Sequence, residues 1–189
     1  IDDVRNKILK TTTENPEDVF NEDPLRVLRA VRFAGYGYDM EPKLDKTIQT
    51  FDNTVLLSKV SKERIADELG KILEKGNVDY LIKSGFITKI MSEFSEFDDK
   101  EYKDNELQHI VDVIKVAREK APTGKKLLFL WSALFHDIGK GSTGTFSDKK
   151  ERWQFLGHEE KSAEIAKKIM SNYKFSSDMI RDVSNLVSQ

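Results

Sequence analysis

The sequence has no cysteine among its 189 residues and only four prolines. The lack of cysteine excludes disulfide bonds and thiolate metal sites, and it fits the reducing cytoplasm in which we expect this protein to work. No apolar run approaches the roughly 20 residues that a membrane-spanning helix needs. We therefore expect no membrane contact.

The sequence also lacks an excess of charge of either sign, with 31 basic and 33 acidic residues. Residues 1–92 carry 15 basic and 16 acidic side chains, and residues 93–189 carry 16 and 17. This balance excludes a protein that coats nucleic acid through a broad positive field. Any contact with nucleic acid must come from a local arrangement of side chains.

What the sequence does contain is apolar spacing typical of helices, which predicts an all-α fold. After an irregular segment at 1–20, Asp23 before Pro24 and Ser61 before an apolar repeat are helix start signals. The acidic stretch 93–106 holds seven acids and two lysines, and its composition predicts a solvated linker. Further helical stretches follow from residue 107, so we expect a boundary between two helical units.

All three histidines lie in the second unit, one in each predicted helical stretch: His109, His136 and His158. Asp137 follows His136 within the apolar segment LLFLWSALFHDIG, which predicts burial. A buried carboxylate beside an imidazole is costly unless something satisfies it, and a divalent cation held by both, with His109 from another helix, would do so. Nitrogen and oxygen ligands do not distinguish Mn, Ni, Mg, Fe or Zn. The alternative is that these are unmetallated core histidines.

The segment NEDPLRVLRAVRF holds a second candidate site. Asp23 and Arg26 are three residues apart and share a helix face, which places an acceptor beside a donor fork. Cytosine and adenine both present an amino donor beside a ring-nitrogen acceptor, whereas uracil and guanine present the reverse. The pair would therefore select C and A without a template. The alternative is a plain helical ion pair, worth roughly a few tenths of a kcal/mol.

These motifs, in this order, resemble the class II tRNA nucleotidyltransferases, which comprise CCA-adding enzymes and bacterial poly(A) polymerases. EDPLRVLRAVRFAGYGY is similar to their base-recognition motif, SKERIADELGKIL to the motif that follows it, and DYLIKSGFITKIMSEF to the next neck segment. His109, the pair His136-Asp137 and the following Gly139-Lys140 resemble the HD superfamily of metal-dependent phosphohydrolases. The resemblance covers essentially the whole chain. It implies a head remnant at 1–20, a helical neck and RNA-binding domain at 21–92, and an HD domain at 93–189.

In the neck, the resemblance implies that base recognition of CTP or ATP falls to Asp23, Arg26 and Arg29. The supporting residues would be Glu22, Arg32, Glu63 and Arg64. Of these, Glu63 and Arg64 would brace the recognition helix. Arg29 would contact phosphate or pair with Glu63.

In the HD domain, the resemblance implies that His109, His136 and Asp137 bind a divalent metal. Lys140 would lie near a substrate phosphate, and His158 would be a weaker site residue. A late aspartate usually closes an HD site, and Asp182 is the nearest candidate, which we do not assign. Either that ligand lies beyond residue 189, or the ligand set is naturally incomplete.

The sequence has no Gly-Gly turn and no Asp-x-Asp pair, which the family's head domain uses to bind phosphate and two Mg²⁺ ions. We therefore expect a fragment that does not polymerise by itself, within a parent that adds CCA to tRNA 3′ ends from CTP and ATP. The motifs do not separate CCA-adding from A-adding or CC-adding relatives, and we favour CCA because the pair accepts both bases. Two alternatives stay open: an HD hydrolase of phosphomonoesters or 2′,3′-cyclic phosphates, and a non-catalytic tRNA-binding module.

Overall fold

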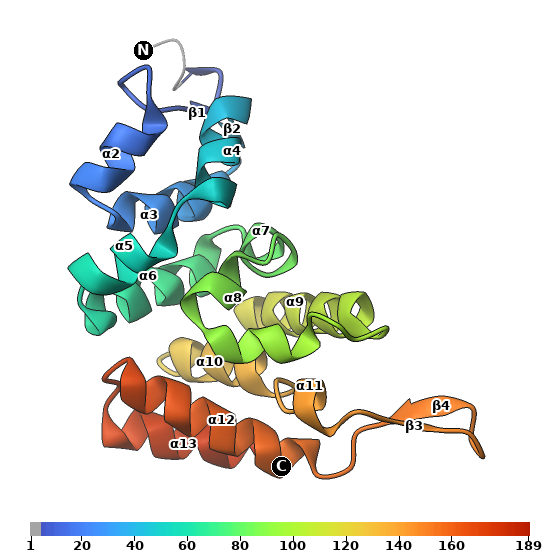
Figure 1. The fold of residues 1–189 in the computed structure, drawn as a ribbon. Helices are drawn as coiled ribbons and strands as arrows, with labels where there is room; N and C mark the ends of the chain where they lie inside the picture. The colour runs from blue at the N-terminus through green and yellow to red at the C-terminus, as the bar shows by residue number, and fades with distance from the viewer. Residues whose placement is uncertain (1–4) are drawn as a thin grey trace. The chain divides into compact units, whose positions relative to one another are not determined.

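The chain forms two compact units, Ile1–Ile90 and Met91–Gln189, in a computed structural model (Figure 1). The structure describes residues 5–189, so the first four residues of the predicted head remnant lie outside the described residues. The described chain holds twelve α-helices and is 66% helical, which confirms the all-α fold class. In the same part of the chain, no helix is long and apolar enough to cross a membrane.

The first unit combines a short parallel strand pair with helices. Strands β1 (Ile8–Leu9) and β2 (Asp39–Met40) pair with Ile8 opposite Asp39. The helices are α2 (Pro16–Glu22), α3 (Leu25–Ala34), α4 (Pro42–Thr50), α5 (Asn53–Lys59), α6 (Lys62–Lys75), α7 (Val78–Lys83) and α8 (Phe86–Ile90). As the sequence predicts, Ser61 caps α6, where its hydroxyl accepts a hydrogen bond from the Arg64 N–H at 3.4 Å.

The core of the first unit forms where α3 packs against α6. Val27, Leu28 and Val31 of α3 are completely buried, and Ile65 and Leu69 of α6 are 0% and 1% exposed. These positions recur three or four residues apart, so each helix has one apolar face. The apolar face of α3 turns inward, which leaves its charged residues on the other side.

Gly35 lets the end of α3 approach the end of α6. A Cβ atom at this position would lie 2.1 Å from the carbonyl carbon of Gly76. Close by, the Asn77 N–H donates a hydrogen bond to the Val31 carbonyl oxygen at 3.3 Å. Any larger residue than glycine would push the two helix ends apart.

The helix predicted to start at Asp23 and Pro24 is α3, but the segment before it, which we expected to be irregular, forms α2. Helix α2 ends at Glu22 and α3 begins at Leu25. Pro24 has no N–H to continue the hydrogen bonding of α2, so the chain turns at this point. The Asp23 carboxylate accepts the Leu25 N–H at 3.3 Å, and the start of α3 is thereby satisfied.

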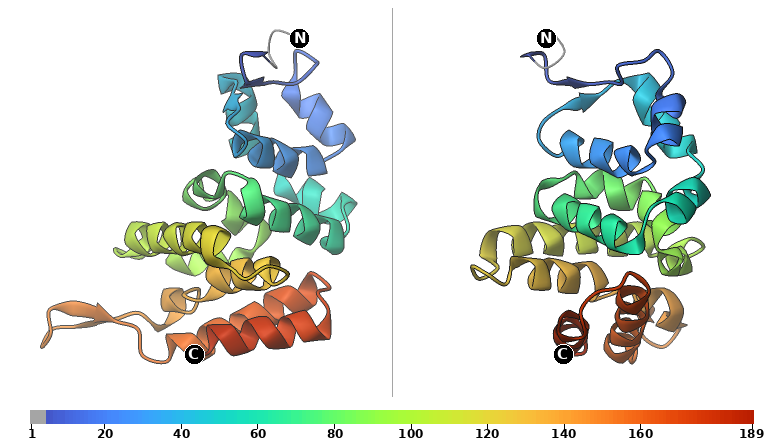
Figure 2. Two further views of the ribbon diagram at one scale, coloured as in Figure 1. Left: turned by 180° about the vertical axis from the view of Figure 1, so that it is seen from behind. Right: turned by 90° about the vertical axis from the view of Figure 1, so that its left-hand side faces the viewer.

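The second unit is a helical bundle with one β-hairpin. Its elements are η1 (Ser92–Phe97, a 3₁₀ helix), α9 (Lys103–Lys120), α10 (Lys126–Phe135), α11 (Lys140–Thr143), β3 (Thr145–Ser147), β4 (Arg152–Gln154), α12 (His158–Asn172) and α13 (Ser177–Val187). Helix α10 packs against α9 and α13, and α12 packs against α13. The antiparallel hairpin extends beyond these helices (Figure 2).

The prediction of a solvated linker at 93–106 is wrong. Phe94, Phe97 and Tyr102 are buried, with 2%, 0% and 5% of their surface exposed. The segment forms η1 and the first turn of α9 within the second unit. The seven acids dominate its composition, but three aromatic side chains among them bury enough apolar surface to fold it.

Candidate functional site

The structure brings the three predicted base-recognition residues together at the start of α3. The Asp23 Oδ2 atom lies 3.8 Å from Arg26 Nε and 3.8 Å from Arg29 Nη1. All three side chains are partly exposed, by 29%, 39% and 44% respectively. An acceptor therefore lies between two guanidinium groups at a surface that a base can reach.

Among the ion pairs around Asp23, Arg26 and Arg29, the one between Glu22 and Arg26 is the shortest. The Glu22 Oε2 atom lies 2.7 Å from Arg26 Nη1, which also donates to the Val19 carbonyl oxygen at 3.4 Å. Two groups on α2 thus orient Arg26, and Asp23 is only loosely paired. Among the described residues, the Asp23 carboxylate accepts one hydrogen bond, from the Leu25 N–H, so it keeps acceptor capacity for a ligand.

Arg32 is braced by a residue that the sequence analysis missed. Its Nε atom lies 2.6 Å from Oε1 of Glu68 on α6, and only 3% of the Glu68 side chain is exposed. Lys71 Nζ lies 3.5 Å from the other Glu68 oxygen. Glu68 lies three residues after Ile65, on the apolar face of α6. A charged residue at a position where the helical spacing predicts an apolar one is the sequence signal for this buried ion pair.

The structure differs from the expected brace by Glu63 and Arg64. Both side chains are exposed on α6, whereas Glu68 is buried against α3. Arg29 lies near Asp23, and no pair between Arg29 and Glu63 occurs among residues 5–189. Glu63 sits in the first turn of α6, on the face opposite its apolar stripe, which explains its exposure.

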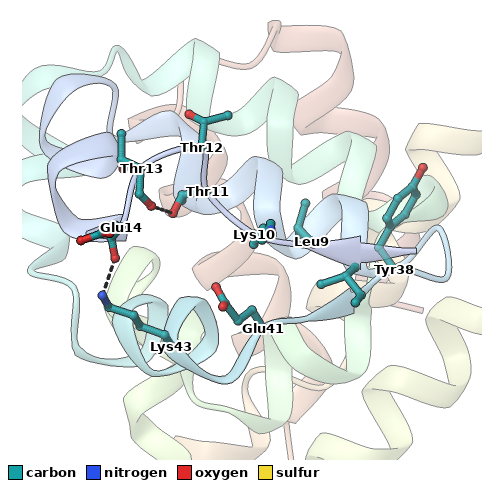
Figure 3. A pocket seen from close by; sticks show the side chains of 10 residues that line it. Leu9, Lys10, Thr11, Thr12, Thr13, Glu14, Tyr38, Glu41 and Lys43 are labelled. Carbon is teal, nitrogen blue, oxygen red and sulfur yellow. Dashed lines mark hydrogen bonds between the residues drawn. The ribbon is translucent and has the colours of Figure 1, made fainter. Parts of the chain in front are cut away.

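A cavity of about 820 Å³ lies elsewhere in the first unit, beside β1 (Figure 3). Lys43 and the segment Lys10–Glu14 line it, and Lys43 Nζ donates to the Glu14 carbonyl oxygen. Thr11 donates to the Thr13 carbonyl oxygen at 2.9 Å. None of the predicted base-recognition residues lines this cavity.

The second unit gathers the three predicted metal ligands into one cluster. One ligand atom each from His109, His136 and Asp137 lies within 4.8 Å of the others. Asp137 Oδ2 lies 3.1 Å from His136 Nε2 and 3.4 Å from His109 Nε2. His109 comes from α9, and His136 and Asp137 follow directly after α10.

His158 approaches the same carboxylate from a third helix. It is the first residue of α12, and its Nε2 atom lies 3.3 Å from Asp137 Oδ1. Asp182, by contrast, pairs with Arg181 on α13, with an Oδ1 to Nη2 distance of 2.8 Å. Asp182 is therefore not part of the cluster. His158, which we expected to be a weaker site residue, contacts Asp137 directly.

The hydrogen bonds of two histidines support a cation at this cluster. His136 Nδ1 lies 2.8 Å from the Ala133 carbonyl oxygen, and His158 Nδ1 lies 2.7 Å from that of Phe155. A carbonyl oxygen only accepts, so each Nδ1 carries a proton and, in the neutral ring, Nε2 presents a lone pair. Both lone pairs then face the Asp137 carboxylate. The buried His136 Nε2 makes no hydrogen bond in the described structure, so the donor set fits a divalent cation.

Lys140 and Glu106 complete the charges around Asp137. Lys140 Nζ lies 2.9 Å from Asp137 Oδ2 and 2.9 Å from Glu106 Oε2. Burial by itself would raise the pKa of Asp137, but His136, when its Nε2 also carries a proton, and Lys140 stabilise the carboxylate and hold its pKa well below the usual value. Burial likewise opposes the charge of Lys140, yet Glu106 and Asp137 raise its pKa. Asp137 is therefore ionised and can bind a cation.

Gly139 positions this cluster against α12. A Cβ atom on Gly139 would lie 2.5 Å from the His158 carbonyl oxygen, and the Gly139 N–H donates to the buried Ser162 hydroxyl at 2.9 Å. The turn that carries His136 and Asp137 can therefore reach the start of α12. This contact is what brings His158 to Asp137.

Comparison with known proteins first defines the class of the two regions. Residues 107–189 match the HD domain family, so the second unit contains an HD domain. Residues 37–97 match the family described as the probable RNA and SrmB-binding site of polymerase A. The HD match includes all four residues of the His/Asp cluster, from His109 to His158.

Individual relatives then specify the family. The chain is 29% identical to the multifunctional CCA protein of Actinobacillus pleuropneumoniae serotype 5b (strain L20), over 99% of this chain and 47% of that protein. It is 26% identical to the multifunctional CCA protein of Pseudomonas fluorescens (strain Pf0-1), over 90% of this chain and 43% of the relative. A CCA-adding enzyme of Lactobacillus helveticus (strain DPC 4571) is 40% identical over 73 residues, which are 38% of this chain and 18% of that enzyme.

The chain is thus homologous to CCA-adding enzymes, and its resemblance to the tRNA nucleotidyltransferase and poly(A) polymerase family is confirmed. The chain spans about half the length of the relatives that match it over nearly all its residues.

Proposed function

We propose that this chain forms the neck and HD regions of a longer tRNA nucleotidyltransferase, which adds CCA to tRNA 3′ ends from CTP and ATP in the cytoplasm. The observation that carries the proposal is the position of Asp23 between Arg26 and Arg29 at the exposed start of α3. The carboxylate accepts from the exocyclic amino group of C or A, and an arginine donates to the adjacent ring nitrogen. The carboxylates that catalyse transfer belong to a head region, with its Mg²⁺ ions, outside these 189 residues.

The test uses the complete protein that carries this sequence, with tRNA lacking its 3′ end. Asp23→Ala removes a charged hydrogen-bond acceptor, so we expect the preference for CTP and ATP over UTP and GTP to fall by roughly 10- to 100-fold. Asp67→Ala, an exposed carboxylate on α6, is the matched control and should keep the preference. Unchanged base selection by Asp23→Ala would refute base recognition by this residue.

A second activity is supported by the HD unit, namely metal-dependent hydrolysis of phosphomonoesters or 2′,3′-cyclic phosphates. His109, His136 and Asp137 would hold a divalent cation, with His158 beside them. When bound, such a cation lowers the pKa of a coordinated water and supplies the nucleophile. Lys140 uses two of its three donors on Asp137 and Glu106, which leaves one for a substrate phosphate.

This activity is tested with the 189-residue chain. After chelator treatment, Mn²⁺, Ni²⁺ or Mg²⁺ is added, bound metal is measured by mass spectrometry, and hydrolysis is followed with p-nitrophenyl phosphate. We expect Asp137→Asn and His136→Ala to lose both metal and hydrolysis. Asp178→Asn, an 82% exposed carboxylate on α13, should keep both. If the wild-type chain binds no metal and hydrolyses nothing, the hydrolase proposal fails, and the alternative of a non-catalytic tRNA-binding module is favoured.

A further inference from the structure

Charge is unevenly distributed within the second unit. Residues 115–126, which form the end of α9, the turn after it and the first residue of α10, carry five basic side chains and one acidic one. The rest of residues 91–189 carry 11 basic and 16 acidic side chains. The nearly neutral total of the unit therefore hides a positive patch, and we call residues 115–126 the basic turn.

The structure gathers these cations around the connection between two neighbouring helices. Helices α9 and α10 pack side by side, so the basic residues that end α9 and those that begin α10 flank the turn between them (Figure 2). Lys115, Lys120 and Lys125 are exposed, and Arg118 and Lys126 are partly exposed. Among residues 5–189, Lys120, Lys125 and Lys126 form no ion pair. These three ammonium groups can therefore bind an external anion without breaking an ion pair.

A nucleic acid backbone fits this charge pattern better than a broad anionic surface does. The phosphates of a duplex form a narrow, dense line of negative charge, which lysine and arginine bind without reading bases. Salt at about 0.1 M limits the reach of exposed charges to about 10 Å. A stem that meets the basic turn is therefore little affected by the acids elsewhere on the unit. A flat anionic membrane would also face those acids.

We propose that the basic turn binds the phosphate backbone of a tRNA stem. The inference rests on the proposed function, in which tRNA is the substrate, and it adds a contact surface in the second unit. This surface lies outside residues 37–97, the region that matches the RNA-binding family. Because lysines contact phosphates as point charges, the basic turn holds the body of the tRNA without selecting its sequence.

Neutral variants of exposed lysines test this contact in the 189-residue chain. Fluorescence anisotropy measures the Kd of labelled tRNA lacking its 3′ end at several NaCl concentrations. We expect the slope of log Kd against log salt to fall by about two in Lys120→Gln/Lys125→Gln, because each phosphate contact contributes about one. The matched control Lys167→Gln/Lys174→Gln removes the same charge from exposed lysines of the second unit outside the basic turn. Its slope should equal that of wild type.

The charge-preserving variant Lys120→Arg/Lys125→Arg should also keep the wild-type slope. Circular dichroism of each variant checks that its helices are intact. Equal slopes for wild type and Lys120→Gln/Lys125→Gln would overturn the contact at the basic turn, while binding of tRNA by the chain would still stand. If the wild-type chain binds no tRNA at any salt concentration, the tRNA-binding part of the proposed function fails together with the basic turn.

A second binding assay distinguishes RNA from an anionic membrane. Val116 and Leu127 adjoin these lysines and are 50% and 43% exposed, which is what a membrane contact would use. The same proteins are therefore mixed with vesicles of equal parts phosphatidylserine and phosphatidylcholine, and binding is measured by sedimentation. We expect no difference between wild type and Lys120→Gln/Lys125→Gln in this assay. Loss of vesicle binding by this variant with unchanged tRNA binding would overturn the proposal and identify lipid as the partner.

Discussion

At the scale of single residues, Tyr80 links two helices of the first unit through one hydrogen bond. Its hydroxyl on α7 donates to Asp45 Oδ1 on α4 at 2.6 Å. Burial, and then the nearby Asp45 carboxylate, raise the pKa of Tyr80 well above its ordinary value of 10. The folded state therefore favours the neutral phenol. The resulting stabilisation is complete below about pH 10 and is lost as the pH rises toward the higher folded-state pKa.

Tyr80→Phe removes this hydrogen bond and its pH dependence. At pH 7 we expect the free energy of unfolding to fall by about 1 kcal/mol, the usual net value of one hydrogen bond. At pH 10.5 the difference between wild type and variant should shrink, because the phenol ionises in unfolded wild type and thereby stabilises that state, whereas the Phe variant has no phenol to ionise. Urea unfolding at both pH values measures this difference. Tyr102 and Tyr173, whose pKa values are also raised, are present in both proteins and cancel. A difference that stays constant would contradict the prediction.

At the scale of helices and strands, the sequence predicts the long amphipathic elements well. Helix α6 has a Ser61 cap and apolar residues at helical spacing, and both signals are local. The hairpin escaped prediction because β3 and β4 have three residues each, too few for an alternating pattern. Helix α2 was also missed, because its seven residues are too few for an apolar repeat at helical spacing.

The candidate sites divide in the same way between local and distant signals. His136 and Asp137 are adjacent, so sequence alone identifies them. Their acidic neighbour Glu106 was hidden in the stretch predicted as a linker, and it meets Lys140 across 34 positions of the chain. Pairing between residues so far apart depends on how helices pack, which single-sequence periodicity does not encode.

At the scale of the whole molecule, each unit has an apolar core of its own. Leu28, completely buried, belongs to the core of the first unit, and Leu134, 1% exposed, belongs to that of the second. Both tryptophans, Trp131 and Trp153, lie in the second unit. Tryptophan fluorescence therefore reports unfolding of the second unit, whereas circular dichroism reports the helices of both.

Substitution of one core leucine in each unit tests whether the two units unfold separately. A buried Leu→Ala change costs about 2–5 kcal/mol through lost burial and the cavity that it leaves. We expect Leu28→Ala to lower the midpoint of a circular dichroism transition in urea and to leave the fluorescence midpoint unchanged. Leu134→Ala should lower the fluorescence midpoint, and the 43% exposed Leu127→Ala should change neither by much. An equal shift of both signals in Leu28→Ala would mean that the chain unfolds as one cooperative body, because two-state unfolding makes all probes coincide.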